Sequence, residues 1–201
     1  GVLNLEGVQT RYENPDEVLA EVVSADKEKA TTLIQKLYQE PIREDLIARR
    51  VQEIKSGGVI CSVSSIPQKA ERFGAIAEEA GVDVFVVQST VSTVRHISTE
   101  YKTLDIAKFC ASMKVPVIVG NTVTFNATRE LMQTGVAAVL IGVGPGAACT
   151  SRGVLGLGVP QVTATADCAA ARDYHFKRTG PYVPIITDGG MSKGGDVCKA
   201  L

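Results

Sequence analysis

Short apolar runs that alternate with helix-like segments constrain the fold of this chain more than any other feature. Six runs rich in β-branched residues are bounded by Gly, Ser or Asn, at residues 2–5, 59–63, 84–87, 117–119, 138–141 and 183–187. They are almost continuously apolar, as expected of strands that are covered on both faces. Strands that recur with helices between them are typical of βαβ units and a parallel sheet. The sequence therefore predicts an α/β fold.

Helical patterns occupy the segments between the runs. The first begins at Asn14-Pro15-Asp16, where a cap residue precedes a proline in the first turn, and continues to residue 23. Further helices are expected at 27–38, 43–55, 68–80, 105–113, 127–132 and 164–176, with another start near Gly195. Three of them lie between Gly7 and Gly57, a segment that we interpret as an elaborated crossover. No low-complexity linker or composition shift marks a boundary, so residues 1–201 are predicted to form a single domain.

Polar or glycine residues follow most of the runs, and their positions distinguish a closed barrel from an open sheet. In a barrel the C-terminal ends of all strands face one shared site, whereas an open dinucleotide-binding sheet carries its glycine fingerprint after the first strand. The residues that follow the runs are Ser64-Ser65, Gln88-Ser89-Thr90, Gly120-Asn121-Thr122, 142–146 and Asp188-Gly189-Gly190. We therefore predict a (β/α)8 TIM barrel. A complete barrel needs about 250 residues, so these 201 residues are expected to supply about six of its eight strands, truncated at both ends.

Charge and cysteine content exclude several classes of protein. The chain has 21 basic and 22 acidic residues, so no net positive field would attract nucleic acid or an anionic membrane surface. No apolar stretch approaches the roughly 18 residues of a membrane span. The five cysteines are widely spaced and include no C-x-x-C pair, which fits a reducing compartment. We expect a cytoplasmic protein with no nucleic-acid partner and no membrane partner.

The segment that begins at Gly142 is the most informative for chemistry. It reads Gly142-Val-Gly-Pro-Gly-Ala-Ala-Cys149-Thr-Ser-Arg152, and its glycines allow a close approach of the backbone to a ligand. A cysteine in a loop at the C-terminal end of a strand is a candidate nucleophile, and a nearby arginine favours its thiolate. The alternative is a cysteine that packs as a small apolar residue. The glycine-rich context favours the nucleophile.

Two polar residues at strand ends, Asp188 and Asn121, each allow two interpretations. Asp188 would accept hydrogen bonds from sugar hydroxyls, with flexible backbone for a phosphate beside it, or it would cap a helix. Asn121 would orient a ligand or close a turn. His96 and His175 are the only histidines, so a catalytic His triad or a multi-histidine metal site is poorly supported. His175 is expected near a solvated helix end.

The cysteine loop closely resembles the signature of the IMP dehydrogenase and GMP reductase family. Other blocks agree with the family in order and spacing, so the resemblance covers essentially the whole chain. These blocks are Asn4-Leu-Glu-Gly7, Gly120-Asn121, Gly156-x-Gly158-Val-Pro160-Gln161, and Asp188-Gly-Gly190 with Gly195-Asp196 and Lys199-Ala200.

The resemblance implies a (β/α)8 barrel in which Cys149 attacks C2 of a purine nucleotide. In an IMP dehydrogenase, hydride then passes from C2 to NAD and water releases XMP; in a GMP reductase, ammonia departs and NADPH delivers hydride, which gives IMP. Cys149, Thr150 and Ser151 would be catalytic, and Asp188 would bind the ribose hydroxyls. The correspondence also assigns phosphate binding to Gly189, Gly190, Ala147 and Ala148. It assigns binding of the nicotinamide cofactor to Gln88, Ser89, Thr90 and Asn121. A monovalent cation such as K⁺ would bind to the backbone carbonyls of Gly144, Gly146 and Cys149.

Three positions depart from the family pattern. Ala147 stands where a serine hydroxyl usually contacts the phosphate, which leaves backbone N–H groups for that contact. Ser151 replaces a threonine implicated in proton handling and preserves a hydroxyl. Gln88 occupies the strand end where most members carry an aspartate near the cofactor, so the family's cofactor contacts do not carry over directly.

The segment between Gly7 and Gly57 is too short to hold the paired regulatory (CBS-type) domains that most IMP dehydrogenases insert after the second strand. This favours a reductase, and the cysteine loop is most similar to a bacterial group, cyanobacterial and actinobacterial, of IMP dehydrogenase-related proteins. We therefore expect a GMP reductase that converts GMP and NADPH to IMP and ammonia. The alternatives are an IMP dehydrogenase, which converts IMP, NAD and water to XMP, and a non-catalytic purine-nucleotide-binding regulatory protein. The cofactor would be NADP(H) or NAD(H), and the assembly a homotetramer or octamer.

Overall fold

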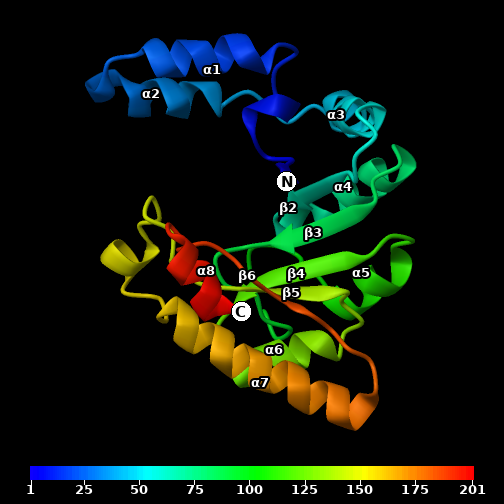
Figure 1. Cartoon of the computed structure of the whole chain (residues 1–201). Coiled ribbons are helices and arrows are strands. Elements are labelled where there is room, and N and C mark those ends of the chain that lie inside the picture. Colours follow the sequence, from blue (N-terminus) through cyan, green and yellow to red (C-terminus); the bar gives the residue numbers. More distant parts are fainter. The chain divides into compact units, whose positions relative to one another are not determined.

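The computed structural model describes residues 1–201 (Figure 1). The chain divides into two compact units, Gly1–Ser65 with Lys69–Phe85, and Ile66–Gln68 with Val86–Leu201. The strands are β1 (Leu3–Asn4), β2 (Ser62–Ser65), β3 (Val84–Gln88), β4 (Val117–Thr122), β5 (Ala138–Ile141) and β6 (Ile185–Thr187). The helices are η1 (Val8–Thr10), α1 (Pro15–Ser24), α2 (Lys27–Leu37), α3 (Glu44–Ser56), α4 (Pro67–Glu79), α5 (Ile106–Ser112), α6 (Phe125–Met132), η2 (Ser151–Leu155), α7 (Gln161–Thr179) and α8 (Gly194–Ala200). That the whole chain acts as one domain stays a prediction.

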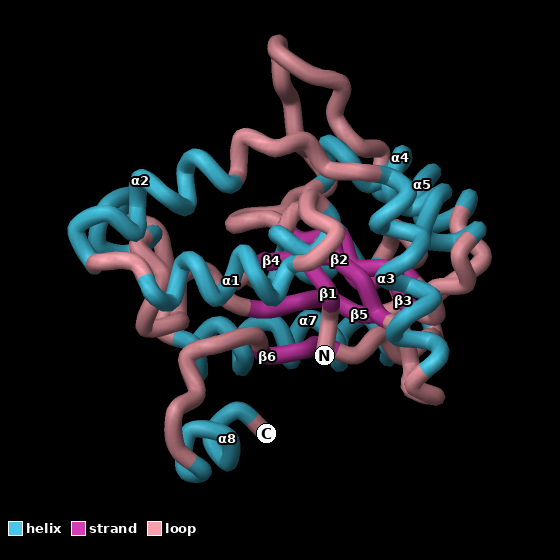
Figure 2. The backbone as a smooth tube through the Cα atoms, turned by 90° about the horizontal axis from the view of Figure 1, so that it is seen from above, coloured by secondary structure: helices cyan, strands magenta, loops and turns pink.

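The six strands form one sheet in the order β1-β2-β3-β4-β5-β6, and Figure 2 marks them in magenta. β1 pairs in parallel with β2, β4 with β5, and β5 with β6. A sequential order of parallel strands is the arrangement of a (β/α)8 barrel, whereas a doubly wound sheet reverses its order at a switch point. The predicted α/β fold, with six of the strands of a barrel, is therefore confirmed.

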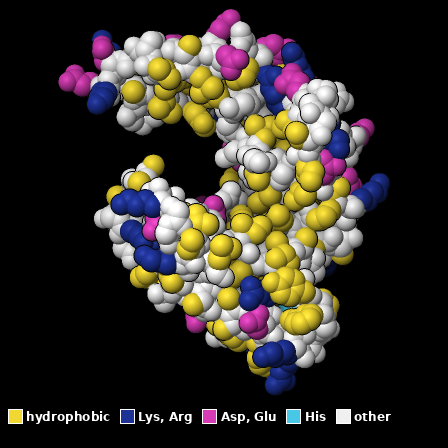
Figure 3. All heavy atoms as spheres, in the orientation of Figure 1, with side chains coloured by type: hydrophobic (Ala, Val, Ile, Leu, Met, Phe, Trp, Pro, Cys, Tyr) yellow, Lys and Arg dark blue, Asp and Glu magenta, His cyan; other side chains and the backbone are white.

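In the first unit, helices α1 and α2 form a hairpin with a small core of its own. Its buried side chains belong to Val8, Val18 and Leu37, against which Tyr12, Val22 and Leu33 pack. Other apolar side chains of the hairpin stay exposed, including those of Leu19, Val23 and Ile34. Figure 3 shows hydrophobic side chains gathered on this hairpin. Within the unit, few buried side chains therefore hold the hairpin together.

Arg50 fastens α3 to the segment around η1. Its Nε donates to the carbonyl of Gln9 at 2.9 Å, and its Nη2 donates to the carbonyls of Tyr12 at 3.2 Å and Glu13 at 2.8 Å. Its Nη1 also forms an ion pair with Glu53 at 2.7 Å, and the side chain is only 11% exposed. The guanidinium thus donates to three backbone carbonyls in and just after η1.

In the second unit, α6 and α7 pack against each other and against the strands (Figure 1). All four residues of β5 are buried, as are Leu131 on α6 and Ala164 on α7. Across the contact between the two helices, the Thr128 hydroxyl lies 3.0 Å from the Cys168 sulfur. The parallel register of β4, β5 and β6 brings their C-terminal ends to one edge, where the candidate site residues lie.

Several element boundaries differ from the expectation. The second apolar run begins at Val59, yet β2 begins at Ser62, and Val59 and Ile60 are 59% and 75% exposed. The expected strand over 183–187 begins only at Ile185, whereas β4 continues to Thr122. The one-turn π-helix η2 was not expected. Apolar composition alone does not show where a buried strand starts.

Helix α7 is longer than expected, and it contains His175. The helix runs from Gln161 to Thr179, so His175 lies about one turn before its C-terminal end. Its side chain is 5% exposed, and the prediction of a solvated position is wrong. No helix of the chain combines the length and the apolar character needed to cross a bilayer.

Candidate active site

Three polar side chains from the ends of different strands meet at the C-terminal edge of the sheet. Gln88 ends β3, Asn121 lies near the end of β4, and Asp188 follows β6. Asn121 Nδ2 donates to Asp188 Oδ2 at 2.9 Å, and Gln88 Nε2 donates to the same oxygen at 3.1 Å. Gln88 Nε2 also lies 3.3 Å from Asn121 Oδ1. The structure thus brings together three of the predicted site residues, and it pairs Gln88 with a predicted substrate-binding residue.

The backbone of Asp188 is held from the neighbouring strand and helix. Its N–H donates to the carbonyl of Ile141 at 2.8 Å. Gln161, the first residue of α7, donates through Nε2 to the carbonyls of Ile141 at 2.8 Å and Asp188 at 3.4 Å. Gln161 therefore clamps the end of β5 to the start of the Asp188 turn. From the sequence, Gln161 was identified only as part of the family signature. Its position at the start of a helix that follows a glycine-rich loop could have indicated that it lies near the site.

Gly142 makes this clamp possible. Its φ is +135°, and a Cβ at this position would lie 2.7 Å from the carbonyl oxygen of Asp188 and 2.8 Å from the amide of Gln161. A side chain would therefore displace both partners. The glycine after β5 is required by close backbone approach as well as by its dihedral angle.

The cysteine loop connects β5 to η2 and leaves Cys149 exposed. Cys149 Sγ lies 3.4 Å from Ser151 Oγ, and the Cys149 N–H donates to the carbonyl of Gly146 at 3.0 Å. The Ser151 hydroxyl, the Ser151 backbone N–H and the positive charge of Arg152 lower the pKa of Cys149 below its ordinary value. Thr150 lies between the two residues, at the N-cap position of η2, where its side chain makes no capping hydrogen bond. The three predicted catalytic residues thus lie side by side where the cysteine loop meets η2; Cys149 and Thr150 are exposed, and Ser151 is half-buried.

The other cysteines with shifted pKa values behave in the opposite way. Burial raises the pKa of Cys61 and Cys168, and it raises the pKa of Cys110 to about 11. Thiolates are the reactive form of cysteine, so a lowered pKa at an exposed position marks a nucleophile. The geometry therefore favours Cys149 as the reactive thiol.

Arg152 holds the shape of the cysteine loop in addition to its charge effect. Its Nε donates to the carbonyl of Val143 at 3.2 Å, and its Nη2 donates to the carbonyl of Val159. These bonds join the start of the loop to the segment that leads into α7. Arg152 is thus a structural residue of the loop, a role that the sequence did not indicate.

The Asp188-Gly189-Gly190 turn contacts the cysteine loop. A Cβ on Gly190 would lie 2.9 Å from Pro145 Cβ and 3.0 Å from the Pro145 carbonyl oxygen, and the φ of Gly190 is +78°. Ala147 and Ala148 follow in the same loop and are exposed. Two of the segments predicted to bind substrate are therefore neighbours, although they are about 40 residues apart in the chain.

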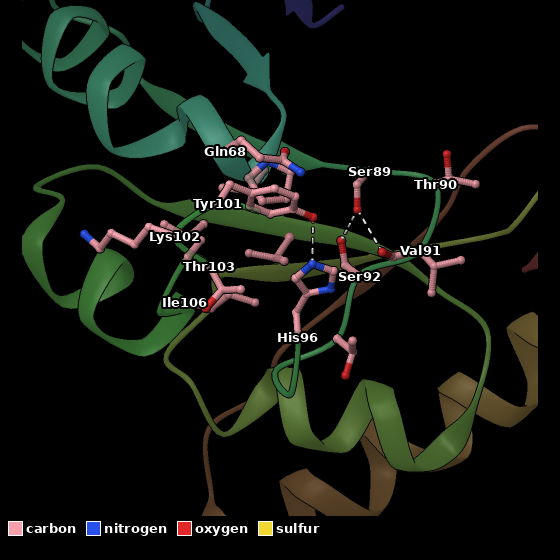
Figure 4. A pocket seen from close by; sticks show the side chains of 15 residues that line it. Gln68, Ser89, Thr90, Val91, Ser92, His96, Tyr101, Lys102, Thr103 and Ile106 are labelled. Carbon is pink, nitrogen blue, oxygen red and sulfur yellow. Dashed lines mark hydrogen bonds between the residues drawn. The ribbon is translucent and has the colours of Figure 1, made fainter. Parts of the chain in front are cut away.

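A cavity of about 260 Å³ lies beside the loop that follows β3. Ser89 and Thr90 line it, together with Ser92, His96 and Tyr101, as Figure 4 shows. His96 Nε2 lies 2.8 Å from the Tyr101 hydroxyl, and the two rings stack with centroids 5.9 Å apart. Gln88 and Asn121 do not line this cavity. The four residues predicted to bind cofactor therefore fall into two pairs, one on the cavity and one on Asp188.

The loop around this cavity is tied to β4. Ser92 Oγ donates to the carbonyl of Gly120 at 2.6 Å, and Ser92 N–H donates to the carbonyl of Asn121 at 2.7 Å. The Ser89 and Ser92 hydroxyls lie 2.9 Å apart. These bonds fix the backbone on both sides of Asn121, whose side chain reaches Asp188.

The carbonyls of Gly144, Gly146 and Cys149 belong to one short loop. Carbonyl oxygens are suitable ligands for an alkali cation, so the donor chemistry fits. Because the Gly146 carbonyl already accepts from the Cys149 N–H, a cation would share this carbonyl with the backbone turn. No cluster of three or more His, Cys, Asp or Glu side chains is suited to a metal ion.

Comparison with known proteins gives consistent matches. A family model described as IMP dehydrogenase / GMP reductase domain matches residues 20–201. An uncharacterized oxidoreductase of Mycolicibacterium smegmatis is 36% identical over 208 residues, which cover 100% of this chain and 56% of that protein. Inosine-5′-monophosphate dehydrogenase of Cryptosporidium parvum is 43% identical over 123 residues, which cover 61% of this chain and 28% of that protein.

A solved structure extends this similarity to the fold. The crystal structure of an IMP dehydrogenase/GMP reductase-like protein from Corynebacterium glutamicum matches with a TM-score of 0.90 and 34% identity, covering 100% of this chain and 53% of that one. The chain thus spans about half the length of the curated relatives that match it throughout. On the family model and these relatives, the chain belongs to the IMP dehydrogenase/GMP reductase family.

Proposed function

We propose that the protein is a purine-nucleotide oxidoreductase that acts at C2 of the base through a covalent adduct on Cys149, and that its reaction is the reduction of GMP to IMP. The observation that carries this proposal is the exposed Cys149 thiol, whose pKa is lowered by Ser151 and Arg152. The thiol belongs to a loop that contacts the Asp188-Gly189-Gly190 turn through Pro145. A nucleophile therefore lies in the same unit as groups suited to a ribose phosphate.

The residues of the cysteine loop would perform the first step. The Cys149 thiolate attacks C2 of guanine and forms a C–S bond, and the 2-amino group takes up a proton and leaves as ammonia. The Ser151 hydroxyl stabilises the thiolate before the attack, and Thr150 presents a second hydroxyl in the same loop. A nicotinamide cofactor, when bound, would supply the hydride for C2, and the C–S bond would break to regenerate the Cys149 thiolate. The overall change is GMP + NADPH + 2 H⁺ to IMP + NH₄⁺ + NADP⁺.

The remaining predicted residues would bind the two ligands. Asp188 would accept hydrogen bonds from the ribose hydroxyls. The phosphate would be held by backbone N–H groups of Ala147, Ala148, Gly189 and Gly190, since none of these residues has a polar side chain. Ser89 and Thr90 would hold part of the cofactor in the cavity that they line. A monovalent cation on Gly144, Gly146 and Cys149 would steady the loop that carries the nucleophile, and assembly into a tetramer or octamer stays a prediction.

Two observations support the reductase over the dehydrogenase. The segment between Gly7 and Gly57 holds only η1, α1, α2 and α3, which leaves no room for paired regulatory domains. The match to the Cryptosporidium IMP dehydrogenase covers 61% of the chain, whereas the match to the Mycolicibacterium oxidoreductase covers all of it. Both observations favour a branch of the family distinct from the regulated dehydrogenases.

The test is a substrate comparison with the full-length protein. It is incubated with GMP plus NADPH and, separately, with IMP plus NAD, while the absorbance of the reduced cofactor is followed. The proposal predicts oxidation of NADPH that depends on GMP. Reduction of NAD with IMP, and no reaction with GMP, would instead identify a dehydrogenase. No reaction in either mixture, with nucleotide binding by calorimetry, would identify the non-catalytic binding protein.

A further inference from the structure

We propose that Gln88 is a positioning residue for Asp188, which it orients toward the ribose of the nucleotide, and that it is not a cofactor-binding residue. The inference rests on the proposed function, because it takes Asp188 as the group that binds the ribose. Gln88 Nε2 lies 3.1 Å from Asp188 Oδ2 and 3.3 Å from Asn121 Oδ1. It does not line the cavity that Ser89 and Thr90 border.

The three side chains form a closed ring of hydrogen bonds. Gln88 donates to both of the others, and Asn121 Nδ2 donates to Asp188 Oδ2 at 2.9 Å. Only one assignment of the two amides satisfies all three bonds, because a carboxylate only accepts hydrogen bonds. Both amide nitrogens therefore face the same carboxylate oxygen, which leaves Asp188 Oδ1 to accept from a ligand.

Backbone hydrogen bonds hold Asn121 and Asp188, two members of this ring, in place. Asn121 is 6% exposed, its N–H donates to the Ser89 carbonyl at 3.0 Å, and its own carbonyl accepts from Ser92 at 2.7 Å. The Asp188 N–H donates to the carbonyl of Ile141. A side chain that is bonded at one carboxylate oxygen on a fixed backbone has few orientations left. Gln88, together with Asn121, thus restricts the direction in which the second oxygen of Asp188 points.

The charge of residue 88 decides this role. A carboxylate in place of the Gln88 amide would be about 3 Å from the Asp188 oxygen, and two carboxylates at that distance repel each other. The neutral amide instead donates a charge-assisted hydrogen bond. A glutamate of the same length at position 88 would therefore oppose Asp188, whereas the glutamine supports it.

The experiment measures how well the full-length protein distinguishes GMP from 2′-deoxy-GMP. Affinities of both nucleotides are measured by calorimetry for the wild type, Q88M, Q88E and the matched control Q133E, which changes an exposed glutamine in the same unit. Q88M removes the hydrogen bonds without adding charge, so it keeps the test valid even if Q88E does not fold. The KM for NADPH is measured on the same variants.

The proposal predicts that the wild type binds GMP at least tenfold more tightly than 2′-deoxy-GMP. In Q88M this preference should fall to about twofold or less, and in Q88E GMP affinity should fall by a further factor of ten or more. Q133E should match the wild type, and the KM for NADPH should change less than twofold in Q88M.

Four results would overturn the proposal. Wild-type discrimination in Q88M, or equal losses for both nucleotides, would refute the orientation of Asp188 by Gln88 while the proposed function stands. A raised KM for NADPH with unchanged GMP affinity would show that Gln88 contributes to cofactor binding instead. A wild type that binds neither GMP nor IMP would refute the proposed function itself, and this inference with it.

Discussion

Cys149 Sγ and Ser151 Oγ lie 3.4 Å apart, and this contact is the first of the causes that lower the pKa of the thiol. Once Cys149 ionises, the Ser151 hydroxyl can donate to the sulfur, and a donor that bonds to the charged form favours the thiolate over the thiol. The relationship links a residue that the sequence marks as a departure from its family to the ionisation of the candidate nucleophile.

The substitution Ser151→Ala should therefore move the ionisation of Cys149 to higher pH. Because the pKa of Cys149 is lowered in the wild type, the thiolate forms at lower pH than in an ordinary cysteine, and removal of the hydroxyl shifts the midpoint upward. The rate of alkylation at Cys149, followed by mass spectrometry against pH, measures this shift, and GMP-dependent turnover at neutral pH should fall severalfold. The control Ser56→Ala removes a hydroxyl that bonds only to the Glu53 carbonyl. An unchanged alkylation profile in S151A would contradict the role of Ser151.

Gly142→Ala should destabilise the second unit and loosen the Asp188 turn. The added methyl group would lie 2.7 Å from the Asp188 carbonyl oxygen at a φ of +135°, so both overpacking and backbone strain apply. The expected loss in the free energy of unfolding is about 2 kcal/mol or more, measured by urea denaturation. Gly153→Ala, which meets no atom within 4 Å, should be close to neutral. Equal stability of the two variants would disprove the close approach at Gly142.

Arg50→Lys should destabilise the first unit more than Arg49→Lys. Arg50 donates to the carbonyls of Gln9, Tyr12 and Glu13, and a lysine cannot reproduce this set of donors. We expect a loss of about 2 kcal/mol for R50K. For R49K we expect less than about 1 kcal/mol, because the Arg49 side chain is 50% exposed and forms only ion pairs. Chemical denaturation of both variants provides the comparison, and equal losses would argue against the carbonyl contacts as the cause.

Asp83 should stabilise the first unit in a manner that depends on pH. Its pKa is lowered first by the hydrogen bond from Lys55, at 2.6 Å, and then by the backbone N–H of Cys61, at 2.7 Å. Because the pKa of Asp83 is lower in the folded state than in the unfolded chain, its contribution to the free energy of unfolding is fully present above the unfolded-state pKa of about 3.9. It is lost as the pH falls through the lower, folded-state value. The difference in unfolding free energy between wild type and D83N should therefore be present at pH 6 and shrink below about pH 4. A difference that stayed constant down to the acid transition would contradict this account.

The sequence predicted the six strands and the eight α-helices as elements, but it did not predict all of their limits. The strand at 138–141 agrees with β5, and Gly142 directly follows its last residue. Thr124 caps α6 by accepting from Ala127 N–H at 3.3 Å, which explains why the helix starts two residues before the apolar pattern does. β2 shows the opposite case, because Val59 and Ile60 are apolar but exposed.

The sequence predicted which residues lie at the candidate site, but it did not predict which of them form hydrogen bonds with one another. The residues after the strands pointed to the C-terminal edge of the sheet, where Gln88, Asn121 and Asp188 now meet. The sequence does not show that Gln88 faces Asp188, which lies 100 residues away. The roles of Gln161 and Arg152 were missed for a similar reason, since both bond to backbone carbonyls that only the folded chain brings near.

The most direct test of the central claim is turnover of GMP with NADPH by the full-length protein and its Cys149→Ala variant, with Cys198→Ala as the control for an exposed cysteine outside the loop. The account predicts that C149A loses turnover while its GMP affinity by calorimetry stays within a few-fold of the wild type, and that C198A retains both. Turnover by C149A at a rate comparable to the wild type would contradict covalent catalysis by Cys149.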